Sequence, residues 1–99
     1  MIALTHEQLE EQVIDYLRLM HWVVFRTHFG ASYKPIIPGW PDVVAFKDGR
    51  TLFVEVKAGR DVVRPKQAQI ALLLESAGIR VVEARRLEDV ILQTSAKPA

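Results

Sequence analysis

The chain has 99 residues, of which 49% are hydrophobic and 25% charged, so we expect one globular domain and exclude wholesale disorder. Its net charge of +1 excludes a generally basic surface, so any nucleic-acid contact must be local. Cysteine is absent, which excludes disulfides and thiolate metal sites and favours a reducing compartment such as the cytoplasm. No apolar run reaches the length of a membrane span.

The N-terminal segment predicts a helix from Thr5, at the cap, to about Met20. Gln8 stands three residues after Thr5, which is the spacing of a capping box. Apolar residues recur at helical spacing and define the stripe that we expect to be buried. These residues are Leu9, Val13, Tyr16, Leu17 and Met20.

Glu10 lies beside this stripe on a helical wheel, next to Val13, Ile14 and Leu17, so it is predicted to face inward. An inward carboxylate on a helix packed against a sheet is a candidate metal ligand or water-orienting group. The alternative is that it reaches solvent at the rim of the helix. His6 lies one turn earlier on the same face, where it either touches the site or caps the helix, and we expect the second.

The residues after this helix predict a strand at 22–28, which is β-branched and aromatic. The segment 29–41 contains two glycines and three prolines and is predicted to be a long loop. Two strands follow at 42–47 and 51–57, joined by a hairpin at Asp48-Gly49.

The second half predicts a loop at 58–64 and then a helix that begins at Pro65 and ends before Gly78. A strand at 79–84 and a short helix at 86–94 complete the chain. We expect the long helix to bury Ile70, Leu73, Leu74 and Ala77. A strand, helix, strand passage implies a parallel crossover, so the fold class is α/β with a mixed central sheet flanked by helices.

The strand at 51–57 carries two charges on one face, because Phe53, Glu55 and Lys57 alternate with apolar residues. Burying such charges costs several kcal/mol unless they are paired or bind something. Taken alone, Glu-x-Lys is better explained by an ion pair or by a strand end that reaches water.

Asp42 changes that interpretation. The Asp48-Gly49 hairpin brings Asp42 and Glu55 to neighbouring strands near the same end of the sheet. Converging carboxylates repel each other, and a divalent cation relieves the repulsion. With only oxygen ligands in prospect, Mg²⁺ or Mn²⁺ fits best. Lys57, beside this site, is a candidate to position a water or stabilise charge on a phosphate.

The order of these residues resembles the PD-(D/E)XK nuclease superfamily, since Pro41-Asp42 is followed after twelve residues by Glu55-Val56-Lys57. The stretches "GWPDVVAF", "FVEVKAG" and "RPKQAQIALLLESAG" resemble the VRR-NUC family. The resemblance covers about residues 5–92 of a single domain spanning 1–99. It implies a restriction-endonuclease-like αβββαβ core.

The resemblance also implies roles for individual residues. Asp42, Glu55 and the main-chain carbonyl of Val56 would bind the metal, and Lys57 would be the catalytic lysine. Gln67 would hold Lys57 or the substrate phosphate.

Glu10 would be the helical acidic residue, as in related Holliday-junction resolvases. Many members of the family place their Glu where this chain has His6, and a Gln where it has Glu10. The carboxylate of this chain therefore stands one helical turn away from the family position, although positions 6 and 10 share a face.

The implied activity is Mg²⁺- or Mn²⁺-dependent hydrolysis of phosphodiester bonds in branched DNA such as Holliday junctions. The implied protein is a homodimer in a bacterial or phage-infected cell, with no membrane contact. The dimer is expected to use the loop at 33–40 or an edge of the sheet. The alternatives are a flap, nick or restriction-type nuclease of the same fold and a non-catalytic DNA-binding module.

Phosphate contacts supply most non-specific affinity for DNA, so local basic residues are the expected DNA contacts. Each of them also has a simpler interpretation as a solvated surface charge. The candidates are Arg26, Lys34, Arg60, Arg64 and Lys66. Tyr33 and Trp40 are candidates to stack on bases, although Trp40 fits better as an anchor for the turn at Pro41.

Overall fold

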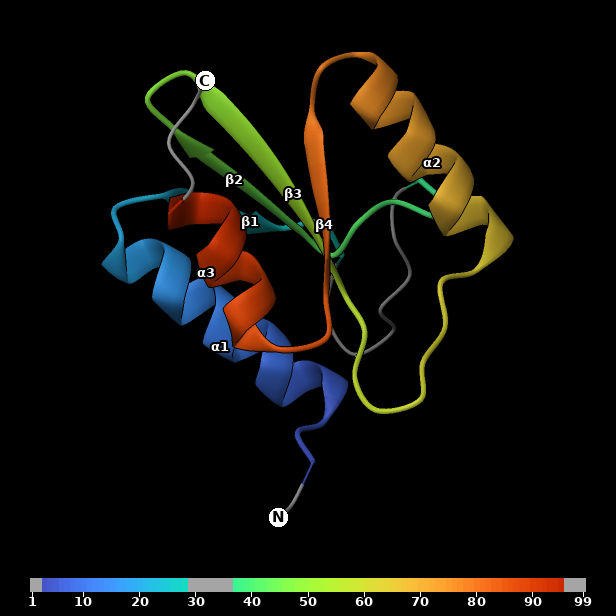
Figure 1. Cartoon of the computed structure of the whole chain (residues 1–99), viewed down its shortest axis with the longest axis horizontal. Helices are drawn as coiled ribbons and strands as arrows, with labels where there is room; N and C mark the ends of the chain where they lie inside the picture. The colour runs from blue at the N-terminus through green and yellow to red at the C-terminus, as the bar shows by residue number, and fades with distance from the viewer. Residues whose placement is uncertain (1–2, 29–36, 96–99) are drawn as a thin grey trace.

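The structure is a computed structural model that describes residues 3–28 and 37–95. Within these ranges it has seven helices and strands, which Figure 1 labels. In chain order they are α1 (His6–Leu19), β1 (Val23–Arg26), β2 (Val43–Lys47), β3 (Arg50–Val56), α2 (Pro65–Ser76), β4 (Arg80–Ala84) and α3 (Leu87–Ser95). Among these described helices, none combines the length and the apolar character that crossing a membrane requires.

The four strands form one sheet in the order β1-β2-β3-β4. Strands β1 and β2 pair antiparallel, as do β2 and β3, whereas β3 and β4 pair parallel across the α2 connection. The predicted mixed sheet and αβββαβ core are therefore confirmed.

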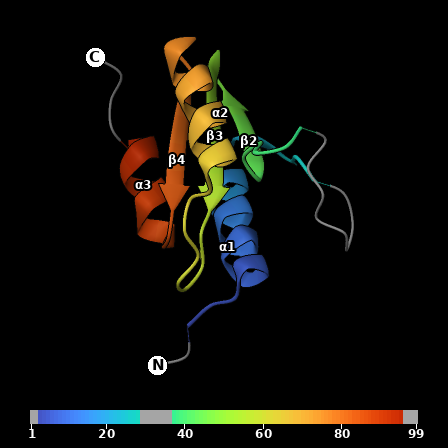
Figure 2. The ribbon, with the colours of Figure 1, turned by 90° about the vertical axis from the view of Figure 1, so that its right-hand side faces the viewer.

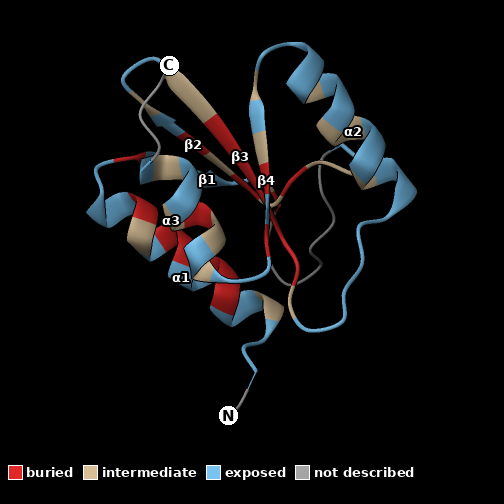
Figure 3. Cartoon of the chain, viewed as in Figure 1, coloured by how far each residue is buried: buried red, intermediate tan, exposed pale blue. Residues whose placement is uncertain are grey.

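The two faces of the sheet are covered unequally. Helices α1 and α3 lie together on one face, and α2 lies on the other (Figures 1 and 2). The buried residues gather on the α1 and α3 side, while most of α2 is exposed (Figure 3). The hydrophobic core joins α1 and α3 to alternate residues of the sheet. Its members include Leu9, Val13, Ile14, Leu17, Val24, Val43, Ala45, Leu52, Val54, Val56, Val82, Ala84 and Val90.

The hairpin between β2 and β3 turns at Asp48-Gly49, as predicted, but β3 begins at Arg50, one residue earlier than expected. Asp48 and Gly49 both have positive φ, at 51° and 74°, as the turns that match strand twist require. Glycine adopts such a φ without strain. The turn pairs Lys47 with Arg50 and sets the register of the whole hairpin.

The expected buried stripes are wrong at three positions. Met20 is 43% exposed, because it caps the end of α1 and the chain turns away at His21, where φ is 70°. Leu73 is 61% exposed and Ala77 is exposed. Helix α2 packs against the sheet mainly through β4, so a single line of residues faces inward. Within α2 the half-buried residues are Gln67, Ile70, Ala71 and Leu74.

Two leucines provide a matched test of this packing. Leu17→Ala should destabilise the fold by about 2–5 kcal/mol, because Leu17 is fully buried and its removal leaves a cavity. Leu73→Ala should change the free energy of unfolding by no more than about 0.5 kcal/mol, since Leu73 is largely exposed. Urea denaturation of both variants measures the difference. Equal losses would contradict the described position of α2.

Candidate active site

Asp42 and Glu55 meet where β2 begins and β3 ends. Asp42 directly precedes β2, and because Val43 pairs with Val54, Asp42 lies next to Glu55. The Val56 amide donates a hydrogen bond of 2.9 Å to Oδ2 of Asp42, which ties this carboxylate to the neighbouring strand. Glu55 is 6% exposed. The predicted convergence of the two carboxylates is therefore a feature of the fold.

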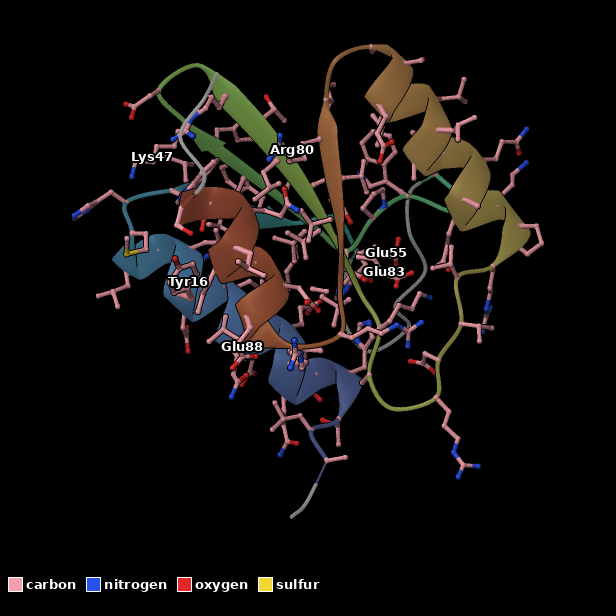
Figure 4. All side chains as sticks on the ribbon, viewed as in Figure 1. Tyr16, Lys47, Glu55, Arg80, Glu83 and Glu88 are labelled. Atoms are coloured by element: carbon pink, nitrogen blue, oxygen red, sulfur yellow. The ribbon has the colours of Figure 1, made fainter. Side chains whose placement is uncertain are left out.

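Glu55 also lies close to β4. Its register partner there is Glu83, and Figure 4 shows the two labelled side chains on the side of the sheet that faces α2. Glu83 is exposed and pairs with Arg85 at 3.2 Å between Oε2 and Nε. Of Glu55 and Glu83, only Glu55 is therefore buried at the site.

Lys57 is the charged residue that follows Glu55 on the same face. It lies just after β3, is 7% exposed, and places Nζ 4.0 Å from Oε1 of Glu55. Its Nζ donates a hydrogen bond of 2.7 Å to Oε1 of Gln67, on the first turn of α2. Gln67 in turn donates from Nε2 to Oε1 of Glu55 at 3.1 Å. One amide therefore orients both charged groups.

Gln67 is itself fixed by the start of α2. The Arg64 amide donates a hydrogen bond of 2.9 Å to Oε1 of Gln67, so this oxygen accepts from two donors. Gly39 helps to position the turn before Asp42 against the same helix. A Cβ at Gly39 would lie 2.6 Å from the carbonyl oxygen of Lys66, and its φ is +83°, so only glycine fits there. The start of α2 and the turn before Asp42 are therefore in direct backbone contact.

Helix α1 contributes Glu10 from the opposite face of the sheet. Glu10 is 1% exposed, so its predicted inward orientation is confirmed. Each of its carboxylate oxygens has a partner. Arg26 donates from Nε to Oε2 at 3.0 Å, and Nε2 of His28 lies 2.8 Å from Oε1.

His6 contacts the site, contrary to the expectation that it caps the helix. Thr5 is the cap, and it forms a complete capping box with Gln8. His6 instead places Nε2 3.5 Å from Oδ2 of Asp42. Ligand atoms of His6, Glu10 and Asp42 all lie within 4.8 Å of one another.

The electrostatics of the site follow from burial and crowding. Burial and the neighbouring charge of Asp42 raise the pKa of Glu55 to about 8. Burial also opposes ionisation of Asp42, but hydrogen bonds from His6 and the Val56 amide outweigh it and lower the pKa of Asp42. The hydrogen bond to Asp42 raises the pKa of His6. Near neutral pH the two carboxyl groups therefore share a single negative charge, and a cation would allow both to ionise.

These donors fit a divalent metal. Carboxylate oxygens suit Mg²⁺ and Mn²⁺, and His6 adds one imidazole to the oxygen ligands expected from the sequence. Asp42 belongs to two groups of donors, because it interacts with Glu55 and also lies within 4.8 Å of ligand atoms of His6 and Glu10.

A cleft of about 770 Å³ opens beside these residues. Asp42, Lys57 and Gln67 lie on its wall. Three exposed basic residues also line it, and they are Arg60, Arg64 and Lys66. The structure therefore brings three of the five predicted DNA contacts to the opening of the site.

Of the remaining predicted DNA contacts that the structure describes, Trp40 also lines this cleft. Arg26 is engaged with Glu10, and Lys34 and Tyr33 fall outside the described residues. Trp40 packs edge-to-face on Phe53, with ring centroids 5.1 Å apart, as an anchor of the turn would.

His28 is the residue that sequence reasoning missed. Alternation along the strand puts Val24, Arg26 and His28 on one face, and Val24 belongs to the core beside α1. The sequence did contain a signal for this contact. Arg26 and His28 lie on the strand face that packs against α1, where the inward Glu10 needs a partner.

Comparison with protein families matches residues 2–86 to the VRR-NUC domain. The chain belongs to the VRR-NUC domain family. A solved structure described as a VRR_NUC domain is similar, with a TM-score of 0.72 and 16% sequence identity, covering 92% of this chain and 97% of that one. At this identity the likeness to the solved structure concerns the fold. Comparison with curated proteins gave no match.

Membership of the VRR-NUC family makes this a nuclease-family domain within the PD-(D/E)XK superfamily. The family resemblance inferred from Pro41-Asp42 and Glu55-Val56-Lys57 is thus confirmed. Nucleases of this kind usually use divalent metals, which agrees with the donors gathered around Asp42.

The pKa of Glu55 predicts how stability depends on pH when no metal is added. A carboxyl group whose folded pKa is raised from 4.5 to about 8 stabilises the fold at low pH and loses that contribution as pH rises through this interval. His6, whose pKa is also raised, acts in the same direction. In EDTA, the free energy of unfolding should fall between pH 4.5 and 8. Glu55→Gln should flatten this fall, as measured by urea denaturation across the interval.

The control for this experiment is Glu75→Gln, on the exposed side of α2. It should leave the slope of stability against pH unchanged. A wild-type slope equal to that of Glu55→Gln would show that Glu55 titrates at its ordinary pKa.

Proposed function

We propose that this VRR-NUC domain is a divalent-metal-dependent DNA endonuclease that cleaves branched DNA, such as four-way junctions, as a homodimer. The observation that carries the proposal is the cluster of Asp42, Glu55 and Lys57, held by Gln67 at the wall of a cleft with a basic opening. A buried lysine beside the buried Glu55 and the half-buried Asp42 is costly for a fold to retain without a ligand.

The metal would be held by Asp42, Glu55 and the carbonyl of Val56, with His6 and Glu10 on the other side of Asp42 as further donors. When bound, Mg²⁺ or Mn²⁺ polarises the scissile phosphate and lowers the pKa of a coordinated water. The chain supplies the carboxylates in a fixed register, so that they need little reorganisation to receive the ion.

Lys57 acts on the phosphate or on the attacking water. Its ammonium group is buried and held by Gln67, so its charge is fixed in a low-dielectric site. A fixed positive charge stabilises the negative charge that develops on the phosphate during attack. Glu10 lies within reach of the Asp42 side of the site and orients the water there.

Arg60, Arg64 and Lys66 hold the DNA through its phosphates. They line the cleft, together with Asp61, and are exposed, so they can contact a DNA backbone without burying charge. A symmetric junction presents two cleavage positions, and a two-fold homodimer would supply one active site to each. Support for the homodimer and for branched DNA comes from the family resemblance.

Two other functions remain open to test. A flap, nick or restriction-type nuclease would use the same residues on another DNA. A non-catalytic DNA-binding module would not need Asp42, Glu55 and Lys57 together, and their proximity argues against it.

Lys57→Ala provides the central test. Metal-dependent cleavage should fall by at least about 100-fold, because a charge that stabilises the transition state is lost. Binding to a four-way junction should stay nearly unchanged. The measurement is gel-based cleavage of a mobile four-way junction, a flap, a splayed arm and a linear duplex, with Mg²⁺, Mn²⁺ or EDTA. Equal cleavage by wild type and Lys57→Ala would remove Lys57 from the site.

Metal binding is tested separately by Mn²⁺ calorimetry. Wild type should bind Mn²⁺ and Asp42→Asn should bind it at least about tenfold more weakly, because Asp42 stands at the centre of the donor set. An absence of heat from wild type would instead favour a structural domain with ion pairs.

Arg60→Ala tests the proposed DNA contacts. Affinity should weaken to a similar extent for every DNA, and the slope of log K against log salt should decrease by about one, as loss of one phosphate contact requires. The matched control is Arg80→Ala, since Arg80 lies on β4, away from the cleft, and bonds Gln93 of α3. Equal salt slopes for Arg60→Ala and wild type would exclude the contact.

A further inference from the structure

The most deeply buried charged side chain of the described residues is that of Glu10, and it is held at two points. Arg26 bonds one carboxylate oxygen and His28 bonds the other, at 3.0 and 2.8 Å. A carboxylate has no proton to give, so Nε2 of His28 carries the proton and donates it. A single hydrogen bond would leave the carboxylate free to rotate about its terminal bond, whereas one partner on each oxygen fixes its plane.

Both partners come from the end of β1, and that end is tied to the site. The Thr27 amide, between them in sequence, donates a hydrogen bond of 2.9 Å to the main-chain carbonyl of Asp42, and the Thr27 hydroxyl donates to the carbonyl of Pro41. The group that holds Glu10 is therefore connected through the backbone to the carboxylate that Glu10 faces.

A purely structural explanation is the weaker one. Replacing a buried ionic cluster by well-packed apolar residues is often neutral or stabilising, so stability alone does not explain this one. A structural ion pair also has no reason to lie against Asp42, yet ligand atoms of Glu10 and Asp42 lie within 4.8 Å of each other.

We propose that Arg26 and His28 are positioning residues that hold the carboxylate of Glu10 toward Asp42 and His6 for phosphodiester cleavage. This inference rests on the proposed function. It gives Arg26 a different task from the phosphate contact expected from the sequence, because its Nε is occupied by Glu10. The described residues that line the cleft include His28 but not Arg26, and in this assignment His28 acts through Glu10 rather than on the phosphate.

The two tasks of Arg26 predict different kinetics. Loss of a phosphate contact raises the dissociation constant for DNA and lowers the salt slope. Loss of positioning lowers kcat and leaves the dissociation constant for DNA and the salt slope unchanged. Arg26→Ala and His28→Ala should each lower kcat by about 10–100-fold, as loss of an outer partner of an active-site ligand does. Arg26→Lys, which keeps the charge, and His28→Gln, which keeps a donor, should recover part of this loss.

The deciding experiment is a double-mutant cycle of Glu10→Gln and His28→Ala, with single-turnover rates measured on saturating junction DNA. If His28 acts through Glu10, its removal should change the rate less than threefold once Glu10 is Gln. Arg18→Ala is the matched control, because Arg18 links α1 to the carbonyl of Val24 away from the site and its loss should leave kcat unchanged. Additive effects of Glu10→Gln and His28→Ala would overturn the proposal, as would a higher dissociation constant with an unchanged kcat for Arg26→Ala.

A second measurement does not depend on cleavage. The Nε2-bound proton of His28 should give a slowly exchanging, downfield resonance in ¹H–¹⁵N spectra of wild type, and Glu10→Gln should move it upfield. Absence of this resonance from wild type would overturn the contact. If wild type cleaves none of the DNAs, the proposed function fails. If the resonance is present although wild type cleaves none of the DNAs, the contact between His28 and Glu10 exists but has no role in cleavage, and the proposed positioning role is overturned.

Discussion

Two carboxylates, the half-buried Asp42 and the buried Glu55, lie side by side, and the rest of the site is arranged around that unfavourable contact. The pKa of Glu55 rises to about 8 because burial and the charge of Asp42 oppose its ionisation, while His6 and the Val56 amide favour the charged form of Asp42. Because the fold imposes this contact, a bound cation would relieve the repulsion between the two carboxylates. The register of the β2–β3 hairpin imposes the contact, and the positive φ angles of Asp48 and Gly49 allow that register.

The site lies at the end of the sheet, where elements from both faces can reach it. Strand β3 sends Leu52, Val54 and Val56 into the core and Glu55 to the other face. Helix α2 meets that second face with Gln67, and α1 approaches from the core face with Glu10 and His6. A position in the middle of the sheet would receive side chains from only one of these helices.

This placement also accounts for the unequal burial of the helices. Helix α1 packs an apolar face on the core and carries Glu10 at the end nearest the site. Helix α2 begins at the site and packs mainly against β4, so leucines such as Leu72 and Leu73 remain largely exposed. The apolar composition of α2 therefore led to an expectation of more burial than the helix has.

The sequence by itself determined the helices and strands, their order and the convergence of Asp42 with Glu55. Hydrophobic periodicity and turn residues act over short distances in the chain, and Asp48-Gly49 sets the pairing of its two strands locally. Only the tertiary structure decided which groups surround Glu10. Its partners Arg26 and His28 lie 16 and 18 residues away in the chain, and their contact depends on how α1 lies across β1. The same packing brings His6 to Asp42. The sequence placed His6 on the helix face of Glu10 but could not place it against Asp42, because the angle of a helix on a sheet is set by the whole core.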